Sequence, residues 1–414
     1  MRFWFAALAL VLVHPVAAQS VSPWPEYRGP SADGQVVGSL PLTWAEDRGV
    51  TWKVPVPGRG WSSPVISAGR VWLTTAPPTG EHMRVLAYDL ESGEELLSQV
   101  LFTVKDPEPV NRLNSYASPS PVASGKHVYV HYGTYGTACL ESASGEVVWS
   151  RDDLTCDHME GPGSSPLLLK DRLILNMDGG DVQYVVALDA KTGKTLWRTE
   201  RSIELEGLEP DLRKAYSTPV LATVDGQPQL VSSGAQATYG YDPASGKELW
   251  RVHHKGFSMS SRPMLVGDRV VLSTGFMRPE LWCVRLGGKG DISESHMVWR
   301  NTRGAPTMPS NVVVDGLLFQ SSDRGMASCV DLEDGETLWQ ERLGADVCAS
   351  PIVSAGRVYF FDRDGKATVI ESSAKFKQLA INQLDDGCMA SPAVVGDALI
   401  LRTETHLYRI EEPR

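Results

Sequence analysis

The sequence lacks the features that mark nucleic-acid-binding proteins. Its 39 lysine and arginine residues are outnumbered by 50 aspartate and glutamate residues, which gives a formal net charge of −11 at pH 7. No stretch concentrates the positive charge, and phosphate binding needs clustered lysine and arginine. We therefore expect no nucleic-acid partner. The hydrophobic fraction of 42% is sufficient for a folded core and excludes general disorder.

Cysteine is scarce and is not arranged in pairs. The 414 residues include six cysteines, with no two adjacent and no Cys-x-x-Cys. A small disulfide scaffold is therefore excluded, although the even number permits isolated disulfides. Cys348 and Cys388 each precede a copy of the sequence repeat described below, and the two copies are neighbours. A disulfide between them is an open alternative.

Long apolar runs are also missing, apart from one short run at the N-terminus. Arg2 is followed by the apolar run 3–13 and by the small residues Val16, Ala17 and Ala18. This order is typical of a secretory signal peptide, so we expect residues 1–18 to be one, with a retained membrane anchor as the alternative. Gln19 stands where a lipoprotein would have cysteine. The sequence thus predicts a secreted or periplasmic protein with no transmembrane segment in the mature chain.

A short serine–proline motif recurs eight times along the chain. Its eight equivalent positions are separated by 57, 45, 53, 44, 48, 40 and 41 residues, and they are Pro64, Pro121, Pro166, Pro219, Pro263, Asn311, Pro351 and Pro392. Motifs that return every 40–50 residues are typical of a solenoid or a β-propeller.

Each repeat has the same internal order of strands and turns. A glycine or aspartate turn follows the motif, then a run of branched and aromatic residues, then a second glycine turn such as Glu91–Glu94 or Lys191–Lys194. A tryptophan stands soon after the second turn in most repeats. Trp52 has the same surroundings near the N-terminus, and the six structural blade tryptophans are Trp52, Trp149, Trp197, Trp250, Trp299 and Trp339.

These repeats predict an all-β fold, an eight-bladed β-propeller of four-stranded antiparallel blades. After Pro392 the sequence has room for only two further strands, 398–402 and 406–410. We expect the segment around Trp52 to supply the missing strand, which would close the ring and remove both exposed edges. The expected organisation is a signal peptide (1–18), an N-terminal leader segment (19–45) and a propeller (46–414).

The repeats resemble the pyrroloquinoline-quinone-like (PQQ-like) β-propeller family. The clearest match is the segment 187–197, which reads ALDAKTGKTLW, and the opening residues 24–30, WPEYRGP, resemble secreted bacterial members. The resemblance implies either of two functions. One branch comprises quinoprotein dehydrogenases, which use PQQ and calcium to oxidise an alcohol or sugar. The other is non-enzymatic and includes the periplasmic BamB-like propeller of the outer-membrane β-barrel assembly machinery.

The sequence departs from the dehydrogenase branch in three respects. It has no adjacent cysteines, its repeats leave little room for insertions, and no set of metal ligands can be matched. We therefore expect a non-catalytic binding or scaffolding module for protein or cell-envelope partners, monomeric and without cofactor or metal. The PQQ–calcium dehydrogenase remains the alternative. Binding of carbohydrate, through Trp61, Tyr116 and Tyr216, is a third option.

The candidate ligand-binding residues lie in the loops that lead into the first strand of each blade. Such loops share one face of a propeller and surround the central funnel. The candidates are Arg59, Trp61, Asn114, Tyr116, His158, Glu160, Lys214, Tyr216, Met259, Arg262, Asp346 and Asp386. The spacing Cys156-x-His158-x-Glu160 leaves a transition-metal site open as an alternative to an ordinary polar loop.

Overall fold

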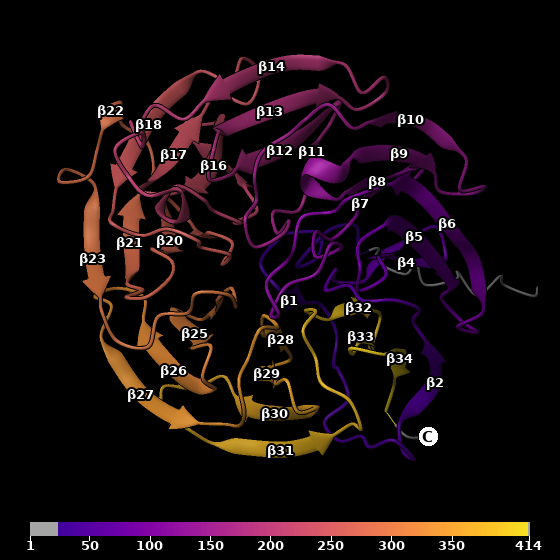
Figure 1. Cartoon of the computed structure of the whole chain (residues 1–414). Helices are drawn as coiled ribbons and strands as arrows, with labels where there is room; N and C mark the ends of the chain where they lie inside the picture. Colours follow the sequence, from indigo (N-terminus) through magenta and orange to yellow (C-terminus); the bar gives the residue numbers. More distant parts are fainter. Residues whose placement is uncertain (1–23, 413–414) are drawn as a thin grey trace, which may run out of the picture.

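The computed structural model describes residues 24–412, which contain eight sheets arranged in a ring, each built on the four strands of a blade (Figure 1). Within every sheet the successive strands of the repeat pair antiparallel. The first strand of each blade contacts the first strand of a neighbour at several places around the axis, whereas the last strand lies at the rim. The predicted eight-bladed propeller is therefore confirmed. The signal peptide predicted for residues 1–18 lies outside the described residues.

The first four blades are continuous in sequence. Blade 1 comprises β3 (Val65–Ser67), β4 (Arg70–Thr75), β5 (His82–Asp89) and β6 (Glu95–Thr103). Blade 2 comprises β7 (Val122–Ser124), β8 (His127–His131), β9 (Thr137–Glu141) and β10 (Val147–Arg151). Blade 3 comprises β11 (Leu167–Leu169), β12 (Arg172–Asp178), β13 (Gln183–Asp189) and β14 (Thr195–Glu200). Blade 4 comprises β15 (Val220–Val224), β16 (Gln227–Gly234), β17 (Ala237–Tyr241) and β18 (Glu248–His253).

The other four blades include the closure of the ring. Blade 5 comprises β19 (Met264–Val266), β20 (Arg269–Ser273), β21 (Leu281–Arg285) and β23 (Met297–Asn301). Blade 6 comprises β24 (Val312–Val314), β25 (Leu317–Ser321), β26 (Met326–Asp331) and β27 (Thr337–Arg342). Blade 7 comprises β28 (Ile352–Ser354), β29 (Arg357–Phe361), β30 (Lys366–Glu371) and β31 (Gln378–Gln383). Blade 8 comprises β32 (Ala393–Val395), β33 (Ala398–Arg402), β34 (His406–Ile410) and β2 (Val50–Pro55).

The remaining elements are the strands β1 (Gln35–Val36) and β22 (Gly290–Asp291) and the 3-10 helices η1 (Gly133–Tyr135) and η2 (Pro210–Leu212). No helix among residues 24–412 is long and apolar enough to cross a membrane.

Burial explains why the strands differ in composition from the axis to the rim. The middle strands β8 and β9 are almost fully buried because each lies between two other strands and between neighbouring blades. The outer strand β6 alternates between more and less exposed residues, which is the period-two pattern of a strand with one wet face. The apolar runs recognised in the sequence are therefore the middle of each blade.

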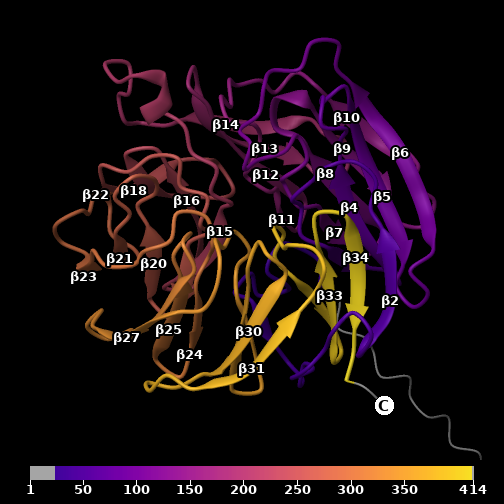
Figure 2. The same cartoon turned by 60° about the horizontal axis from the view of Figure 1, so that its bottom comes forward.

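The ring closes by pairing of β2 with β34. The two strands are antiparallel, with Trp52 opposite Arg409 and Val54 opposite Leu407, and they lie side by side in Figure 2. The two predicted strands of the last repeat coincide with β33 and β34. This pairing gives blade 8 its fourth strand, so that every blade of the described chain has four.

Outer-strand tryptophans dock onto the second glycine turn of the following blade. The Trp197 indole N–H donates to the Pro243 carbonyl at 3.2 Å, and its ring lies over Gly246. Trp52, Trp149, Trp299 and Trp339 make the same kind of bond to a carbonyl of the next blade. A Cβ at position 246 would lie 2.5 Å from the Trp197 ring, so glycine is required there for the close approach.

Trp250 departs from this pattern because the following blade has a longer connection. Strand β22, within that connection, pairs parallel with β18 and places Gly290 opposite Trp250. The indole N–H of Trp250 consequently donates to Gln229 Oε1 of its own blade at 2.7 Å. The side chain is fully buried and still packs against blade 5 residues such as Val270 and Leu272.

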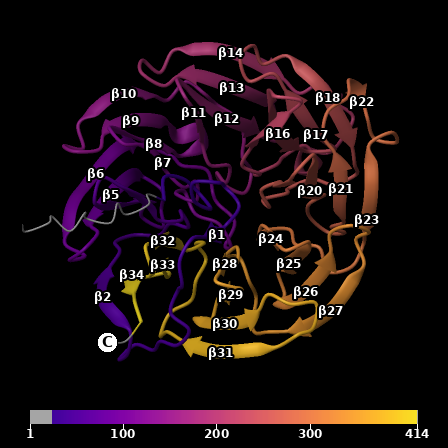
Figure 3. The same cartoon turned by 180° about the vertical axis from the view of Figure 1, so that it is seen from behind.

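The N-terminal segment Trp24–Val36, which we call the channel plug, lies against the inner strands near the middle of the ring (Figure 3). Trp24 bridges to Ile66 of β3, the Pro25 carbonyl accepts a hydrogen bond from Ala123 of β7, and β1 pairs parallel with β28. Each of these contacts is made near one end of an inner strand, the end farther from the serine–proline motif. The predicted leader segment thus includes residues that close the channel from one side.

Candidate functional site

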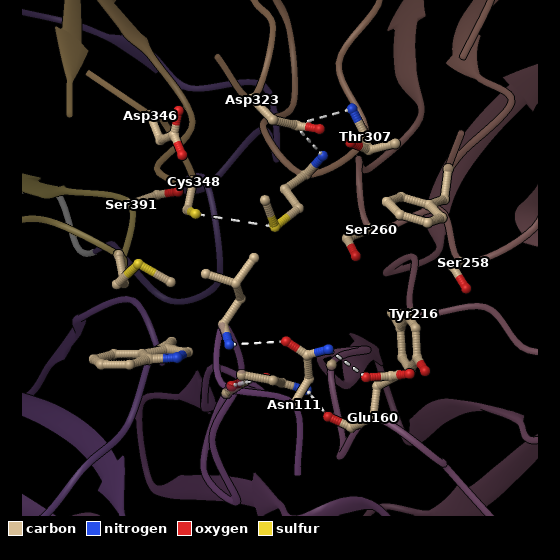
Figure 4. Close-up of a pocket in the computed structure, with 18 of the residues that line it drawn as sticks. Asn111, Glu160, Tyr216, Ser258, Ser260, Thr307, Asp323, Asp346, Cys348 and Ser391 are labelled. Carbon is tan, nitrogen blue, oxygen red and sulfur yellow. Dashed lines mark hydrogen bonds between the residues drawn. The ribbon is translucent and has the colours of Figure 1, made fainter. Parts of the chain in front are cut away.

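A central cavity of about 640 Å³ opens on the face formed by the loops that lead into each blade (Figure 4). Residues from all eight blades line it. Loops between the second and third strands also contribute, through Phe276 of blade 5, Asp323 of blade 6 and Arg363 of blade 7. Both sets of loops therefore lie on the same face.

A belt of hydroxyl groups surrounds the deep end of the cavity. The residue before the repeated proline donates its backbone N–H to the hydroxyl of the equivalent residue in the next blade, at 2.8–3.1 Å. Seven of the eight positions carry this hydroxyl: Ser63, Ser120, Ser165, Thr218, Ser310, Ser350 and Ser391. The serine of the repeated motif therefore links neighbouring blades, a role that its spacing in the sequence did not reveal.

Arg262 occupies the eighth position of the hydroxyl belt and binds the channel plug instead. Its guanidinium donates to Glu26 Oε2 at 2.8 Å, to the Tyr27 carbonyl at 2.7 Å and to the Pro219 carbonyl at 3.1 Å. The side chain is 1% exposed. Arg262 was predicted to bind a ligand in the funnel, but the structure places it below the cavity, where its charge is neutralised by Glu26.

Tyr27 of the channel plug forms part of the floor. Its hydroxyl lies 2.9 Å from Ser350 Oγ and 3.2 Å from Ser310 Oγ, and the residue lines the cavity. Arg28 beside it is buried and donates to the carbonyls of Asp33 and Asn311, and burial lowers the pKa of its guanidinium to about 10. Tyr27 was not among the predicted site residues, because its partners lie 283 and 323 residues away in the sequence.

A second ring of residues lies two positions before the hydroxyl belt in each blade. All eight of these residues line the cavity, in blade order Trp61, Ser118, Gly163, Tyr216, Ser260, Met308, Cys348 and Met389. Three consecutive members carry sulfur. The Cys348 thiol lies 3.9 Å from Met308 Sδ, and Figure 4 shows Cys348 directed into the cavity.

The charged groups of the cavity wall are largely paired with each other. Lys214 is 2% exposed and forms ion pairs with Asp211 and, at 3.6 Å, with Glu160. Across the cavity, Asp346 lies 3.6 Å from Arg324 and 3.8 Å from Arg363. The wall therefore offers few uncompensated charges to a ligand.

Asp323 stabilises the cavity wall by accepting hydrogen bonds from the backbone. Its carboxylate accepts hydrogen bonds from the backbone N–H groups of Thr307, at 3.2 Å, and Met308, at 3.0 Å. Burial raises the pKa of this carboxyl group. Asp323, between β25 and β26, was not predicted because the candidates were taken only from the loops that lead into the first strands.

Six of the twelve predicted ligand-binding residues line the cavity. They are Trp61, Asn114, Glu160, Lys214, Tyr216 and Asp346. Asn114 donates to the carbonyls of Glu160 and Pro162, and the Tyr216 hydroxyl donates to the His158 carbonyl. These bonds connect loops of neighbouring blades, so the wall is held in place independently of any ligand.

The other six predicted residues lie outside the cavity lining, Arg262 among them. Arg59 lies over the Trp61 ring and donates to the Arg112 carbonyl, and the Tyr116 hydroxyl donates to the Glu108 carbonyl. Met259 is fully buried, and Asp386 accepts hydrogen bonds from Thr405. Position in a leading loop therefore did not suffice to predict access to the funnel, because half of these side chains hold the loops together.

His158 is also buried, and its loop does not form a metal site. Its Nε2 accepts a hydrogen bond from the Thr134 N–H at 3.0 Å, and burial lowers the pKa of its imidazole to about 4. Cys156 lies 3.5 Å from the ring, whereas Glu160 turns toward Asn111 and Lys214. Among residues 24–412, no group of three or more histidine, cysteine, aspartate or glutamate side chains could hold a metal ion.

The residues of the cavity do not fit PQQ with calcium. Calcium prefers six to eight oxygen ligands, and the described residues lack a cluster of carboxylates that could supply them. Three basic side chains of the wall, Lys214, Arg324 and Arg363, already pair with carboxylates of the protein. A negatively charged quinone that binds any of these three side chains would therefore have to displace a carboxylate of the protein.

All six cysteines have free thiols, and only Cys348 is partly exposed. Cys388 is buried, and its burial raises the pKa of the thiol well above the usual range. The structure therefore does not contain a disulfide between Cys348 and Cys388. Burial also raises the pKa of the Cys348 thiol, to about 12.

Comparison with known proteins agrees with the ring of repeats. A family model described as "Outer membrane protein assembly factor BamB" matches residues 38–153, 181–281 and 280–405. The chain belongs to this family. The BamB protein of Yersinia pestis is 24% identical to it over 269 residues, which cover 52% of the chain and 67% of the Yersinia protein. The predicted membership of the PQQ-like, BamB-like propellers is therefore confirmed.

Solved structures show how widely this fold is used. BamB from Moraxella catarrhalis has a TM-score of 0.62 and 12% identity, with 87% of this chain and 97% of that chain covered. A europium-containing methanol dehydrogenase has a TM-score of 0.63 and 12% identity, with coverages of 92% and 89%. Because an assembly factor and a dehydrogenase both have this fold, the fold alone does not decide the function.

Proposed function

We propose that this BamB-like propeller is a non-catalytic, secreted or periplasmic binding module, which holds a protein or cell-envelope partner through its loop face and central funnel. One observation carries the proposal. The cavity is lined by all eight blades, and its wall is prebuilt, because hydrogen bonds and ion pairs between its own loops hold it in place. A rigid scaffold that presents variable loops around a cavity is suited to recognition. We expect the chain to be monomeric.

The family relationship supports the same role. Relatives are described as outer membrane protein assembly factors, and a factor of this kind acts by contacting other proteins. An exposed apolar group lies at the mouth of the cavity, where Phe276 is 56% exposed and the adjacent Met277 is 75% exposed. Exposed apolar side chains beside a polar wall are common at protein-binding surfaces.

Site-specific photocrosslinking in the living cell tests the proposal. A photoreactive residue placed at Arg112 or at Phe276, on the loop face, should give one major adduct with the same envelope protein. Matched positions in the same blades but on the opposite turn face are Lys126 and Asp268, and these should give none. Equal crosslinking from both faces, or no adduct from the loop face, would contradict the proposal.

The dehydrogenase alternative has its own measurement. We expect purified protein mixed with PQQ and Ca²⁺ to show no bound quinone spectrum and no reduction of an electron-accepting dye with alcohols or sugars. Quinone binding with dye reduction that is lost when Lys214 is replaced by methionine would instead establish an enzyme and overturn the non-catalytic role.

A further inference from the structure

We propose that Met308, Cys348 and Met389 form a binding site for a soft monovalent metal ion, Cu(I), in the wall of the central cavity. These residues occupy the equivalent ring position in blades 6, 7 and 8, each two residues before a serine of the hydroxyl belt. The repeat therefore places Cys348 in the blade between those of the two methionines, and all three residues line the cavity. This site lies beyond the proposed partner-binding role and does not depend on it.

The measured sulfur separation suits a shared metal ion. The Cys348 Sγ and Met308 Sδ atoms are 3.9 Å apart. Metal–sulfur bonds are about 2.3 Å long, as for zinc thiolates, so two sulfurs bound to one ion at trigonal or tetrahedral angles are separated by roughly 3.8–4.0 Å. The two atoms thus need little movement to take up a common ion.

The chemistry of the donor set selects Cu(I). Thiolate and thioether ligands favour soft ions such as Cu(I), whereas Cu(II) favours nitrogen and oxygen ligands, and zinc sites without histidine use several thiolates rather than one. The described residues that line the cavity include no histidine. One thiolate and two neutral thioethers give a site of charge −1, which a monovalent cation neutralises.

Access also favours a metal ion at this position. Cys348 is the one cysteine of the described chain that is not buried, and Met308 is also partly exposed. Both side chains line the cavity, so an ion can reach them from its open face.

Binding of Cu(I) at this site releases one proton and changes no oxidation state. The Cys348 thiol releases its proton to solvent, and the thiolate and the two thioethers donate electron pairs to Cu(I). No electron is transferred, and no other reactant is required. Deprotonation of cysteine on metal binding is the general behaviour of such sites.

Anaerobic titration of the purified chain with Cu(I), in competition with a chromophoric Cu(I) chelator such as bicinchoninate, tests the site. We expect one ion per chain and an affinity that falls at least tenfold in Cys348→Ser, Met308→Leu and Met389→Leu. The control Met297→Leu removes a similarly half-buried thioether far from the cavity and should leave the affinity unchanged. Methionine and leucine are close in volume, so these variants should fold.

Two measurements on the unmodified protein keep the proposal falsifiable if a variant is unstable. X-ray absorption should show only sulfur in the first coordination shell, and bound Cu(I) should protect Cys348 from alkylation by iodoacetamide. The proposal is overturned if the chain binds no Cu(I), if all three variants retain the parental affinity, or if nitrogen ligands dominate the shell.

Discussion

At the scale of single residues, Arg262 shows how one exception in a repeat creates a specific contact. Seven blades have a hydroxyl at this position, and each hydroxyl accepts a backbone hydrogen bond from the preceding blade. Arginine cannot accept such a bond, but its long side chain reaches the channel plug at Glu26 and Tyr27. The loss of one inter-blade bond is therefore offset by an attachment between blade 5 and the N-terminal segment.

We predict that Arg262→Ser lowers the free energy of unfolding by about 2–4 kcal/mol. Serine restores the eighth hydroxyl, but Glu26 keeps a largely buried carboxylate without a partner, which costs more than one gained hydrogen bond. Urea unfolding measures the change. Arg269→Ser, which removes exposed ion pairs with Asp268 and Glu333, should cost less than about 1 kcal/mol. Equal effects of the two substitutions would contradict this role of Arg262.

Three buried histidines connect stability to acid. Burial lowers the pKa of His158 to about 4 and the pKa values of His131 and His254 to about 3, against about 6.5 in an unfolded chain. Between the folded and unfolded values, the unfolded state binds more protons. The contribution of these histidines to the free energy of unfolding is therefore fully present above about pH 6.5. It is lost as the pH is lowered toward 4, by up to roughly 1.4 kcal/mol per pH unit for each histidine.

We predict that His158→Gln reduces the slope of stability against pH between pH 6.5 and 4.5 by close to one proton. Glutamine can accept the Thr134 N–H through its amide oxygen but takes up no proton. Urea unfolding at a series of pH values gives the slope for parent and variant. An unchanged slope would show that His158 is not protonated on unfolding in this range.

At the scale of secondary-structure elements, blades are joined by an outer-strand tryptophan and the glycine turn of the next blade. Gly246 and Gly69 have nearly the same backbone conformation, with φ of +72° and +73°. A Cβ at position 246 would approach the Trp197 ring to 2.5 Å, whereas a Cβ at position 69 would meet nothing within 4 Å. Substituting alanine at each of these two glycines therefore separates the destabilisation caused by backbone strain from that caused by displacing the docked tryptophan.

We predict that Gly246→Ala destabilises the protein by about 2–4 kcal/mol and Gly69→Ala by about 1 kcal/mol. Both substitutions place alanine at positive φ, which costs about 1 kcal/mol, but only the first also forces the indole away from its turn. Thermal and urea unfolding measure both variants, and Trp197 fluorescence should change only in the first. The interpretation fails if the two losses are the same.

The same comparison shows the limit of sequence reasoning for these elements. The repeated tryptophan and the glycine turn are local patterns, and both were identified from their spacing. Trp250 shares the pattern but bonds within its own blade, because β22 from the following connection occupies the outer edge of blade 4. Only the folded chain decides which turn lies beside each tryptophan.

At the scale of the whole molecule, the ring depends on one pairing between segments at opposite ends of the described chain. Strand β2 follows the channel plug and pairs with β34 near the C-terminus, so unfolding of either strand opens blade 8. A covalent link across this pairing should restrict the unfolded chain strongly, because it closes a loop that includes nearly the whole propeller.

We predict that a disulfide introduced by Pro55→Cys and His406→Cys, which are paired residues, raises the free energy of unfolding more than a matched short-range disulfide. The control is His127→Cys with Glu141→Cys, a paired position within blade 2. The loop-entropy relation gives about 3 kcal/mol for the short loop and about 2–3 kcal/mol more for the ring-closing one. Urea unfolding of the oxidised and reduced forms measures both, and equal gains would show that ring closure is not the limiting contact.

The sequence by itself determined the number of blades, the order of strands within each blade and the family. These follow from short-range spacing, because alternating burial and tight turns act over a few residues. The tertiary structure alone decided the hydroxyl belt, the channel plug held by Arg262, and the row of Met308, Cys348 and Met389. Each of these joins residues about 40 to more than 300 positions apart, and only closure of the ring brings them to one axis.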